Sequence, residues 1–245
     1  MAPSSIPVSE LPVLTKDNDK PPPAERFQAG SILLMDKPIN WTSFDVVKYV
    51  RNRIPVKKVG HAGTLDPLAT GLLILCCGKA TKSISQIQGK PKVYEAEVRF
   101  GASTPSYDSE TDPDQLAEWD HITEESIIKT LKDNFTGTVM QTPPIYSALN
   151  VGGERLYKKA RRGETVEIEE RLVEIYSVEL VDFSLPFVKL RIRCGKGTYI
   201  RSLAHDLGLS LRSRAYLSSL RRTETEPFAV RNAFTPEEFN RWIKS

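Results

Sequence analysis

The chain has 245 residues, of which 40% are hydrophobic, and a formal net charge of +3. This length and composition suffice for a sizeable buried core, as one large domain or as a main domain with a smaller insert. The longest apolar run, over residues 72–77, is far shorter than the roughly 20 residues that a membrane-spanning helix needs, so no membrane span is expected.

The N-terminal residues 1–28 contain three consecutive prolines and mixed charges without an apolar stretch. This composition is typical of neither a secretory signal nor an Arg-rich transit peptide. It predicts a disordered tail. Residues 29–245 are then expected to form the folded domain.

Strand and helix signals follow in the first part of this domain. Residues 31–35 are expected to form a strand, and Thr42 or Ser43 can cap the helix that comes next. A glycine-rich loop over residues 60–71 then leads into the apolar run 72–77, which is interpreted as a buried strand.

The middle of the chain continues this mixture. Residues 92–101 alternate between apolar and polar side chains, which is the period of a half-buried strand. Thr123 is expected to begin a helix that has two acids in its first turn. Ile127, Ile128 and Leu131 are expected to face inward from that helix.

The remaining elements complete the prediction of the fold class. A short basic helix is expected around residues 154–162, a succession of strands over 165–194 and a helix over 199–211. Thr235 and Glu238 form a capping box that begins a last helix. Because strands outnumber helices and do not alternate regularly with them, the sequence predicts an α+β fold around a mixed, largely antiparallel sheet with flanking helices.

Charge is segregated along the chain. Residues 46–94 contain nine basic residues and a single carboxylate, Asp66, and residues 183–223 again contain nine basic residues and one acid. Residues 108–125, in contrast, hold eight acids and no Lys or Arg. Scattered surface lysines would be interleaved with acids, so this pattern favours a polyanionic partner such as nucleic acid.

Familiar motifs for cofactors and hydrolases are absent from the sequence. It contains no P-loop, no dinucleotide-binding fingerprint, no zinc-protease motif and no serine-hydrolase elbow. The three cysteines form no Cys-x-x-Cys pair, which argues against a disulfide or zinc framework and favours a reducing, cytoplasmic setting. Any chemistry is therefore expected from ordinary side chains, with no cofactor and no metal.

Asp66 is the main candidate for such chemistry. An Asp-Pro pair on its own is typical of a helix or turn cap. Asp66, however, is the lone acid of a strongly basic stretch and lies between Gly63 and Gly71, where the backbone can approach a ligand closely. A glycosidase would need a second carboxylate and a metal nuclease several clustered acids, so a nucleophilic aspartate acting on a nucleotide is favoured.

The segment around Asp66 also resembles a known catalytic motif. Gly60-His61-Ala62-Gly63-Thr64-Leu65-Asp66-Pro67-Leu68-Ala69-Thr70-Gly71 is similar to the catalytic segment of TruB pseudouridine synthases. Five further blocks of that family occur in the family's order and at similar spacing: Asp36-Lys37-Pro38, Lys92-Val93-Tyr94-Glu95-Ala96, Gln141-Thr142-Pro143-Pro144-Ile145-Tyr146-Ser147-Ala148, Gly197-Thr198-Tyr199-Ile200-Arg201 and Leu220-Arg221-Arg222-Thr223. The resemblance runs from about Gly30 to Phe239.

The resemblance implies a fold, an activity and a nucleophile. The fold would be that of a pseudouridine synthase with a thumb-like insertion at about residues 102–146. The activity would be the isomerisation of uridine to pseudouridine in the T-loop of tRNA, at conventional position 55, with Asp66 as nucleophile and without a cofactor. The ribose carbon C1′ and the uracil carbon C6 are both open as points of attack.

The resemblance also implies roles for further residues, some of which have an ordinary structural alternative. Tyr94 would stack on the flipped base and take part in removing its ring proton, and its alternative is a core aromatic. Arg201 would pair with Asp66, and its alternative is a phosphate-binding or surface arginine. Tyr199 and Leu220 would border the uracil.

Contacts with RNA are expected outside this group. His61 would help to hold the everted nucleotide, whereas Lys37 and Pro38 would pack against the catalytic loop. The acid-poor stretches would bind RNA, while the acidic residues 108–125 would face away from it. Residues expected to bind the RNA backbone lie on the short basic helix: Arg155, Lys158, Lys159, Arg161 and Arg162.

The expected partner is the T-arm of tRNA, bound by a monomer that needs neither a membrane nor an obligatory protein partner. The chain ends at Ser245, before the small C-terminal RNA-binding domain that many relatives carry. The main alternative is a non-catalytic tRNA-binding or tRNA-folding protein on the same scaffold, and Asp66 favours the enzyme. A second alternative is a guide-RNA-dependent synthase of the dyskerin type, and the missing C-terminal domain favours a stand-alone enzyme.

Overall fold

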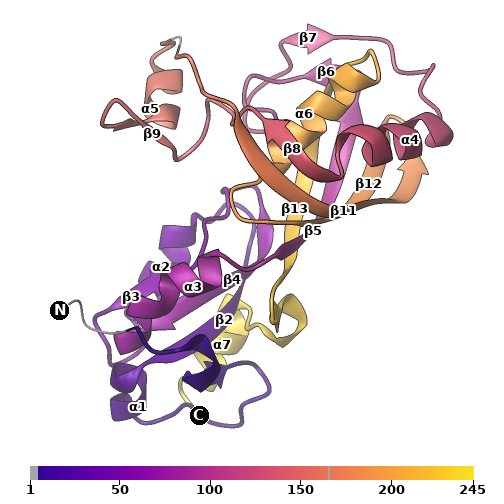
Figure 1. Cartoon of the computed structure of the whole chain (residues 1–245). Coiled ribbons are helices and arrows are strands. Elements are labelled where there is room, and N and C mark those ends of the chain that lie inside the picture. The colour runs from indigo at the N-terminus through magenta and orange to yellow at the C-terminus, as the bar shows by residue number, and fades with distance from the viewer. Residues whose placement is uncertain (1–4, 165) are drawn as a thin grey trace. The chain divides into compact units, whose positions relative to one another are not determined.

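A computed structural model describes residues 5–164 and 166–245, and the chain groups into two compact units (Figure 1). The first unit comprises residues 1–93 and 221–245, and the second comprises residues 94–220. Two long strands, β5 (Lys92–Phe100) and β13 (Ala215–Thr225), carry the chain from one unit to the other.

The catalytic domain predicted over residues 29–245 therefore spans both units. The insertion predicted at about residues 102–146 lies within the second unit. None of the described helices is both long enough and apolar enough to cross a membrane.

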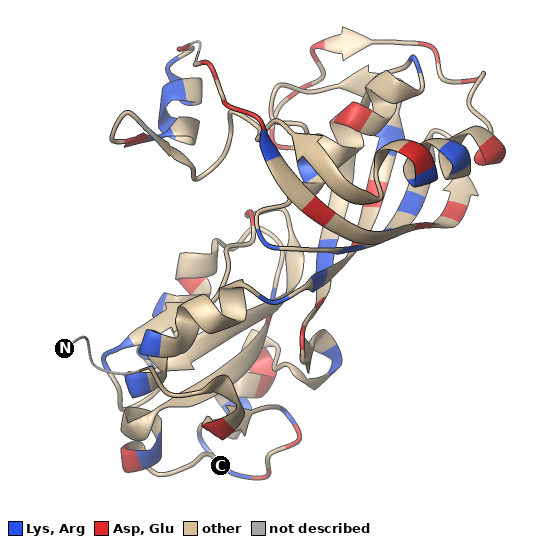
Figure 2. Ribbon diagram, in the orientation of Figure 1, with Lys and Arg blue, Asp and Glu red and all other residues tan. Residues whose placement is uncertain are grey.

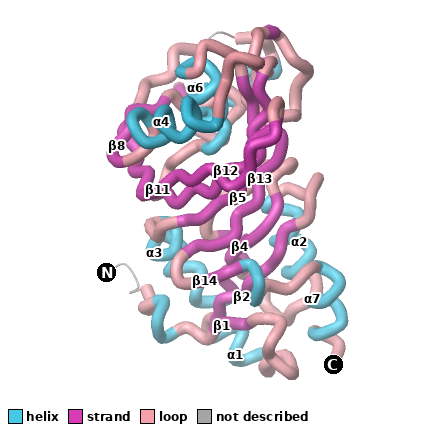
Figure 3. Tube along the Cα trace, turned by 90° about the vertical axis from the view of Figure 1, so that its right-hand side faces the viewer, coloured by secondary structure: helices cyan, strands magenta, loops and turns pink. Residues whose placement is uncertain are grey.

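Parallel and antiparallel strands are mixed in the sheet of the first unit, whose strands are magenta in Figure 3. Besides β13, its strands are β1 (Val13–Leu14), β2 (Ser31–Lys37), β3 (Val59–His61), β4 (Thr70–Cys77) and β14 (Phe228–Ala229). The order is β1-β2-β4-β13, with β2 antiparallel to β4 and with parallel pairing of β1 to β2 and of β4 to β13. The shorter β3 and β14 pair antiparallel with β4 and β13. The predicted strands at 31–35 and 72–77 are confirmed.

The structure differs from the predicted disordered tail at residues 5–28. Strand β1 lies parallel to β2, and Leu14 of β1 is buried together with Leu11 and Phe27. These large apolar side chains remove enough surface from water to order a segment whose composition is otherwise polar. Residues 1–4 of the predicted tail lie outside the described residues.

Helices of the first unit are α1 (Ala24–Ala29), α2 (Ser43–Arg51), α3 (Ile84–Gln88) and α7 (Pro236–Trp242), with 3-10 turns at Val8–Glu10, Gly78–Ser83 and Val230–Asn232. Helix α2 begins with a capping box, because the side chain of Thr42 accepts a hydrogen bond from the backbone N–H of Asp45 at 3.1 Å. The predicted box of Thr235 and Glu238 begins α7 in the same way. Apolar side chains of both helices pack with β2 and β4 in one hydrophobic cluster.

The sheet of the second unit has the order β13-β5-β12-β11-β8. Its further strands are β8 (Gly137–Gln141), β11 (Arg171–Ser184) and β12 (Phe187–Cys194), and β11 is antiparallel to both of its neighbours. Separate two-stranded pairs form from β6 (Ala102–Ser103) with β7 (Gln115–Leu116) and from β9 (Asn150–Val151) with β10 (Glu154–Arg155). The predicted α+β class with a mixed sheet is confirmed.

Helices of the second unit are α4 (Glu124–Asn134), α5 (Leu156–Arg161) and α6 (Ile200–Ser210). Thr123 caps α4 as predicted, and Ile127 and Leu131 are buried. The inward position predicted for Ile128 is wrong, because its side chain is 50% exposed. Ile127 and Leu131 are four residues apart and therefore lie on the same, buried face of the helix. Ile128 follows Ile127 and lies on the solvent-exposed face.

Candidate active site

The loop that contains Asp66 connects β3 to β4 in the first unit. The backbone N–H of Ala69 donates to the carbonyl oxygen of Asp66 at 3.1 Å and closes a turn. Gly71, with φ of 101°, is the second residue of β4 and lies directly against the backbone of Arg222, where a Cβ atom would collide with that residue. A glycine is therefore required at this end of the loop.

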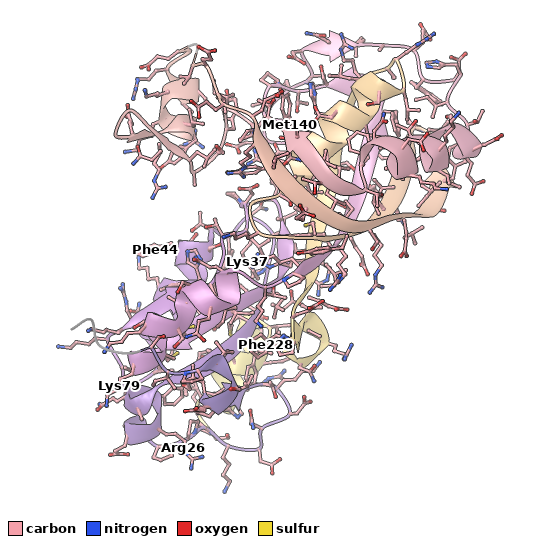
Figure 4. All side chains as sticks on the ribbon, in the orientation of Figure 1. Arg26, Lys37, Phe44, Lys79, Met140 and Phe228 are labelled. Atoms are coloured by element: carbon pink, nitrogen blue, oxygen red, sulfur yellow. The ribbon has the colours of Figure 1, made fainter. Side chains whose placement is uncertain are left out.

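Lys37 fastens this loop from β2. Its Nζ atom donates to the carbonyl oxygens of Pro38 at 3.0 Å, Trp41 at 2.6 Å and Pro67 at 3.2 Å, and the residue is fully buried. Figure 4 labels Lys37. Burial lowers the pKa of the Lys37 ammonium to about 8, while the negative charge of Asp66 acts in the opposite direction. The expectation that Lys37 would pack against the loop agrees with these contacts.

Ser43 and Arg222 hold the loop at other points, and sequence reasoning gave neither of them a role in the site. The hydroxyl of Ser43 donates to the carbonyl of Leu65 at 3.1 Å and accepts from its N–H at 2.9 Å. The buried Arg222 donates to the carbonyls of Leu72 at 2.7 Å and Gly63 at 3.2 Å. The position of Arg222 in one of the family blocks was the sequence signal that could have identified it.

An ion pair links two of these family blocks within the first unit. The guanidinium of Arg221 contacts both carboxylate oxygens of Asp36, at 2.6 and 3.0 Å. This two-point geometry fixes the planes of both groups. Strands β2 and β13 are therefore joined at the residues next to Lys37 and Arg222.

His61 lies at the end of β3, just before the loop. Burial lowers the pKa of its imidazole, an interaction with the backbone of Gly63 opposes this, and the positive charge of Arg222 lowers it further. The neutral imidazole is thus favoured. This state suits the predicted contact with RNA, which needs no charge on the ring.

Tyr94 and Tyr199 belong to the second unit. Tyr94 lies on β5 with 9% of its surface exposed, and the alternation predicted for residues 92–101 is confirmed by the buried side chains of Ala96 and Val98. Tyr199 precedes α6, and its N–H and C=O bond to the side-chain amide of Gln141 at 2.8 and 3.0 Å. The predicted role of each ring toward uracil stays a prediction.

Arg201 is buried in the second unit on the first turn of α6. It donates to the carbonyl oxygens of Ser106 at 3.1 Å and Tyr146 at 2.9 Å, and its Nη1 atom lies 3.6 Å from the carboxylate of Asp108. The alternative of a surface arginine is therefore wrong, since only 3% of Arg201 is exposed. A buried guanidinium must be matched by acceptors, and these three oxygens lie against its two Nη atoms.

Asp108 is a partner that sequence reasoning missed. It was grouped with an acidic stretch expected to face away from RNA, yet only 6% of it is exposed. Its Oδ1 atom accepts hydrogen bonds from the hydroxyl of Ser106 at 2.6 Å and the N–H of Glu110 at 2.9 Å. No local pattern distinguished this buried carboxylate from its exposed neighbours.

The predicted site residues thus fall into two groups. The first unit contains His61, Asp66 and Lys37, of which Lys37 and Asp66 interact, whereas the second contains Tyr94, Tyr199, Arg201 and Leu220. The pairing of Asp66 with Arg201 stays a prediction. In the described part of the chain, no group of three or more His, Cys, Asp or Glu side chains is arranged to hold a metal ion.

Figure 2 shows basic residues in blue on the short helix α5, and the arginines at its C-terminal end contact acids. Arg161 contacts Glu110 at 3.0 Å, and Arg162 contacts Glu154 and Glu164, each at 2.7 Å. Arg155 donates to the carbonyl of Ala148, and Lys158 and Lys159 lie on the helix itself. The acidic stretch is therefore not wholly separate from the basic helix, because Glu110 contacts it.

Solved structures resemble this chain over most of its length. The archaeal box H/ACA sRNP Nop10-Cbf5 complex contains a chain with a TM-score of 0.67 and 25% identity, matched over 92% of this chain and 57% of that one. A Cbf5-Nop10-Gar1 complex gives the same TM-score with 27% identity, over 95% and 58%. The present chain spans less than two thirds of the length of both.

Sequence relatives are more similar still. Residues 51–200 match the family described as TruB family pseudouridylate synthase, N terminal domain. A protein named tRNA pseudouridine synthase B from Bacteroides fragilis is 47% identical over 223 residues, covering 89% of this chain and 95% of that protein. One from Flavobacterium johnsoniae is 48% identical over 216 residues, covering 85% and 94%.

These matches define an enzyme of the pseudouridine synthase class. Within that class, the chain belongs to the TruB family.

Proposed function

We propose that this enzyme converts uridine to pseudouridine in the T-loop of tRNA, at conventional position 55, with Asp66 as nucleophile and without a cofactor. The tRNA substrate is supported by the relatives named tRNA pseudouridine synthase B, which are 47% and 48% identical. The observation that carries the choice of nucleophile is the Lys37 ammonium, which is held on the Asp66 loop and interacts with the Asp66 charge. A neighbouring cation keeps a carboxylate ionised, as a nucleophile must be.

In the proposed reaction, the Asp66 carboxylate attacks the target nucleotide at the ribose C1′ or the uracil C6. The bond between C1′ and N1 breaks, the base turns within the site, and a bond forms between C1′ and C5. A proton leaves C5, N1 takes up a proton, and release of Asp66 completes an isomerisation, so no atom is gained or lost. Water must be kept out while the base is detached.

The second group of residues would act on the base. Tyr94 stacks on the uracil and takes part in removing the C5 proton, while Tyr199 and Leu220 border the ring. Arg201 pairs with Asp66 and orients it, and the acceptors around Arg201 hold its guanidinium in place. His61 holds the everted nucleotide.

Recognition of tRNA would rely on phosphates rather than on base sequence. Helix α5 and the two residues that flank it offer an array of cations: Arg155, Lys158, Lys159, Arg161 and Arg162. Phosphate oxygens can replace the carboxylates that now contact Arg161 and Arg162, because both anions suit a two-point contact with guanidinium. The enzyme would work as a monomer in the cytoplasm, without an obligatory protein partner.

The test uses purified protein and an unmodified tRNA transcript, with no nucleotide cofactor, guide RNA or second protein. Pseudouridine is expected at position 55, and a transcript with cytidine at that position should yield none. Product at another site would contradict the assignment of the T-loop. A requirement for a guide RNA would instead support the dyskerin-type alternative.

A further inference from the structure

Two neighbouring residues of one loop contact two residues of α6 in the second unit. The carboxylate of Asp108 lies 3.6 Å from the guanidinium of Arg201. The ring of the preceding residue, Tyr107, stacks on the ring of His205 with centroids 3.8 Å apart and planes inclined by 12°. Because Arg201 and His205 are four residues apart, they lie on the same face of the helix. The loop is thus attached to α6 at two adjacent points.

The backbone of Tyr107 adopts a conformation that needs support. Its φ of 61° lies in the left-handed region, which is unfavourable for a residue with a bulky side chain. Its N–H donates to the carbonyl of Thr104 at 3.1 Å, and its own carbonyl accepts from the N–H of Leu217 at 3.0 Å. Such a conformation persists where the surroundings hold it, and the ring stack is one of those restraints.

His205 contributes its ring face rather than a charge. Its Nδ1 atom is buried and has no hydrogen-bond partner among the described residues. Burial, together with the positive charge of Arg214, lowers the pKa of the imidazole, so the neutral ring is favoured. The face of this neutral ring stacks on Tyr107.

We propose that the stack of Tyr107 on His205 is a positioning device for Arg201. The stack holds the loop so that the carboxylate of Asp108 and the carbonyl of Ser106 stay against the Arg201 guanidinium. Neither ring needs to touch the substrate. The inference rests on the proposed role of Arg201 in orienting Asp66.

A small displacement of the Arg201 guanidinium would be sufficient to reduce turnover. Arg201 is almost fully buried, so its guanidinium has little freedom to recover its position by changing rotamer once an acceptor moves. A misplacement of about 1 Å in a catalytic array can reduce the rate about a hundredfold. Loss of the stack should therefore reduce turnover more than binding.

The experiment compares alanine with ring-retaining substitutions. Tyr107→Ala and His205→Ala are each expected to lower kcat at least about tenfold, with KM for tRNA within about twofold of the wild type. Tyr107→Phe and His205→Phe keep the stack and should restore kcat. Phe187→Ala serves as the matched control, because it removes a partly exposed aromatic ring of the same unit. The centroid of the Phe187 ring lies 5.9 Å from Cζ of Arg99.

A thermal melt of each variant distinguishes a loss of kcat in a folded protein from a loss of activity caused by unfolding. If the alanine variants fail to fold, Tyr107→Leu decides, since it keeps apolar bulk without an aromatic face. Loss of kcat in Tyr107→Leu with recovery in Tyr107→Phe supports the proposal. Equal kcat in these two variants, or wild-type kcat in folded alanine variants, would overturn it.

Asp66→Asn is measured in parallel to keep the two proposals apart. If Asp66→Asn retains turnover, the proposed nucleophile is wrong, whatever the stack does. If Asp66→Asn is inactive while Tyr107→Ala and His205→Ala keep wild-type kcat, only the positioning role fails.

Discussion

The ammonium nitrogen of Lys37 lies 3.2 Å from the carbonyl oxygen of Pro67, the residue that follows Asp66. A side chain of β2 thereby fixes the backbone of the candidate catalytic loop. Two more carbonyl oxygens, of Pro38 and Trp41, accept from the same nitrogen. One buried cation therefore holds three carbonyl oxygens, two from the segment that follows β2 and one from the Asp66 loop.

Replacing this cation should affect both stability and activity. Lys37→Met leaves three carbonyl oxygens without their donor and is expected to lower the free energy of unfolding by about 2–4 kcal/mol. The loop is then less well held, so turnover should decrease at least about tenfold. Urea unfolding and a pseudouridine assay measure the two effects. Lys244→Met, at an exposed lysine, is the control, and equal stability of the two variants would contradict the account.

The pH dependence of stability should also reveal Lys37. Burial lowers its pKa from 10.5 to about 8, so between these values the unfolded chain holds the proton and the folded chain does not. The contribution of Lys37 to the free energy of unfolding should therefore rise with pH across this window and be flat below it. The wild type is expected to gain stability relative to Lys37→Met from pH 8 to 10.5. Parallel curves for the two proteins would show that the lysine is not perturbed.

The sequence was informative where the signal was local. The caps at Thr123 and Thr235 were predicted, and that of α2 was narrowed to Thr42 or Ser43, because each cap needs only a pattern of a few neighbouring residues. The alternation in β5 was visible for the same reason. The ordered structure of residues 5–28 could not be predicted from the sequence, because the burial of Leu14 depends on the pairing of β1 with β2.

The site shows the same division between local and distant contacts. Asp66 stood out because it is a lone acid among bases, within a segment typical of a family. Asp108 did not, since its contact with Arg201 joins residues far apart in the sequence. Arg222 was hidden because a buried arginine looks like any other basic residue of an acid-poor stretch.

The contribution of Asp206 to stability should change with pH in the direction opposite to that of Lys37. Burial, followed by the charge of Glu170, raises the pKa of its carboxyl from 3.8 to about 6. Between these values the folded chain holds more protons than the unfolded chain, so the contribution of Asp206 to stability declines as pH rises. Asp206→Asn should therefore be more stable than the wild type at pH 7, with a smaller difference at pH 4. A stabilisation that does not change with pH would contradict this, and Asp112→Asn, at an exposed aspartate, is the control.

Helix α5 should govern the affinity for tRNA. Arg161→Glu combined with Arg162→Glu is expected to weaken binding at least about tenfold at low salt and to reduce the slope of log affinity against log salt by about 2. Lys129→Glu with Lys132→Glu makes the same change of charge on α4 and should have little effect. Binding measured across a salt series decides, and an unchanged slope would place the RNA elsewhere.

The most direct test of the central claim is a single-turnover assay of Asp66→Asn with tRNA carrying uridine at position 55. The asparagine side chain has nearly the same size but cannot act as a nucleophile, so binding should remain close to that of the wild type while no pseudouridine forms. Pseudouridine at the wild-type rate in this variant would contradict the assignment of Asp66 as the nucleophile.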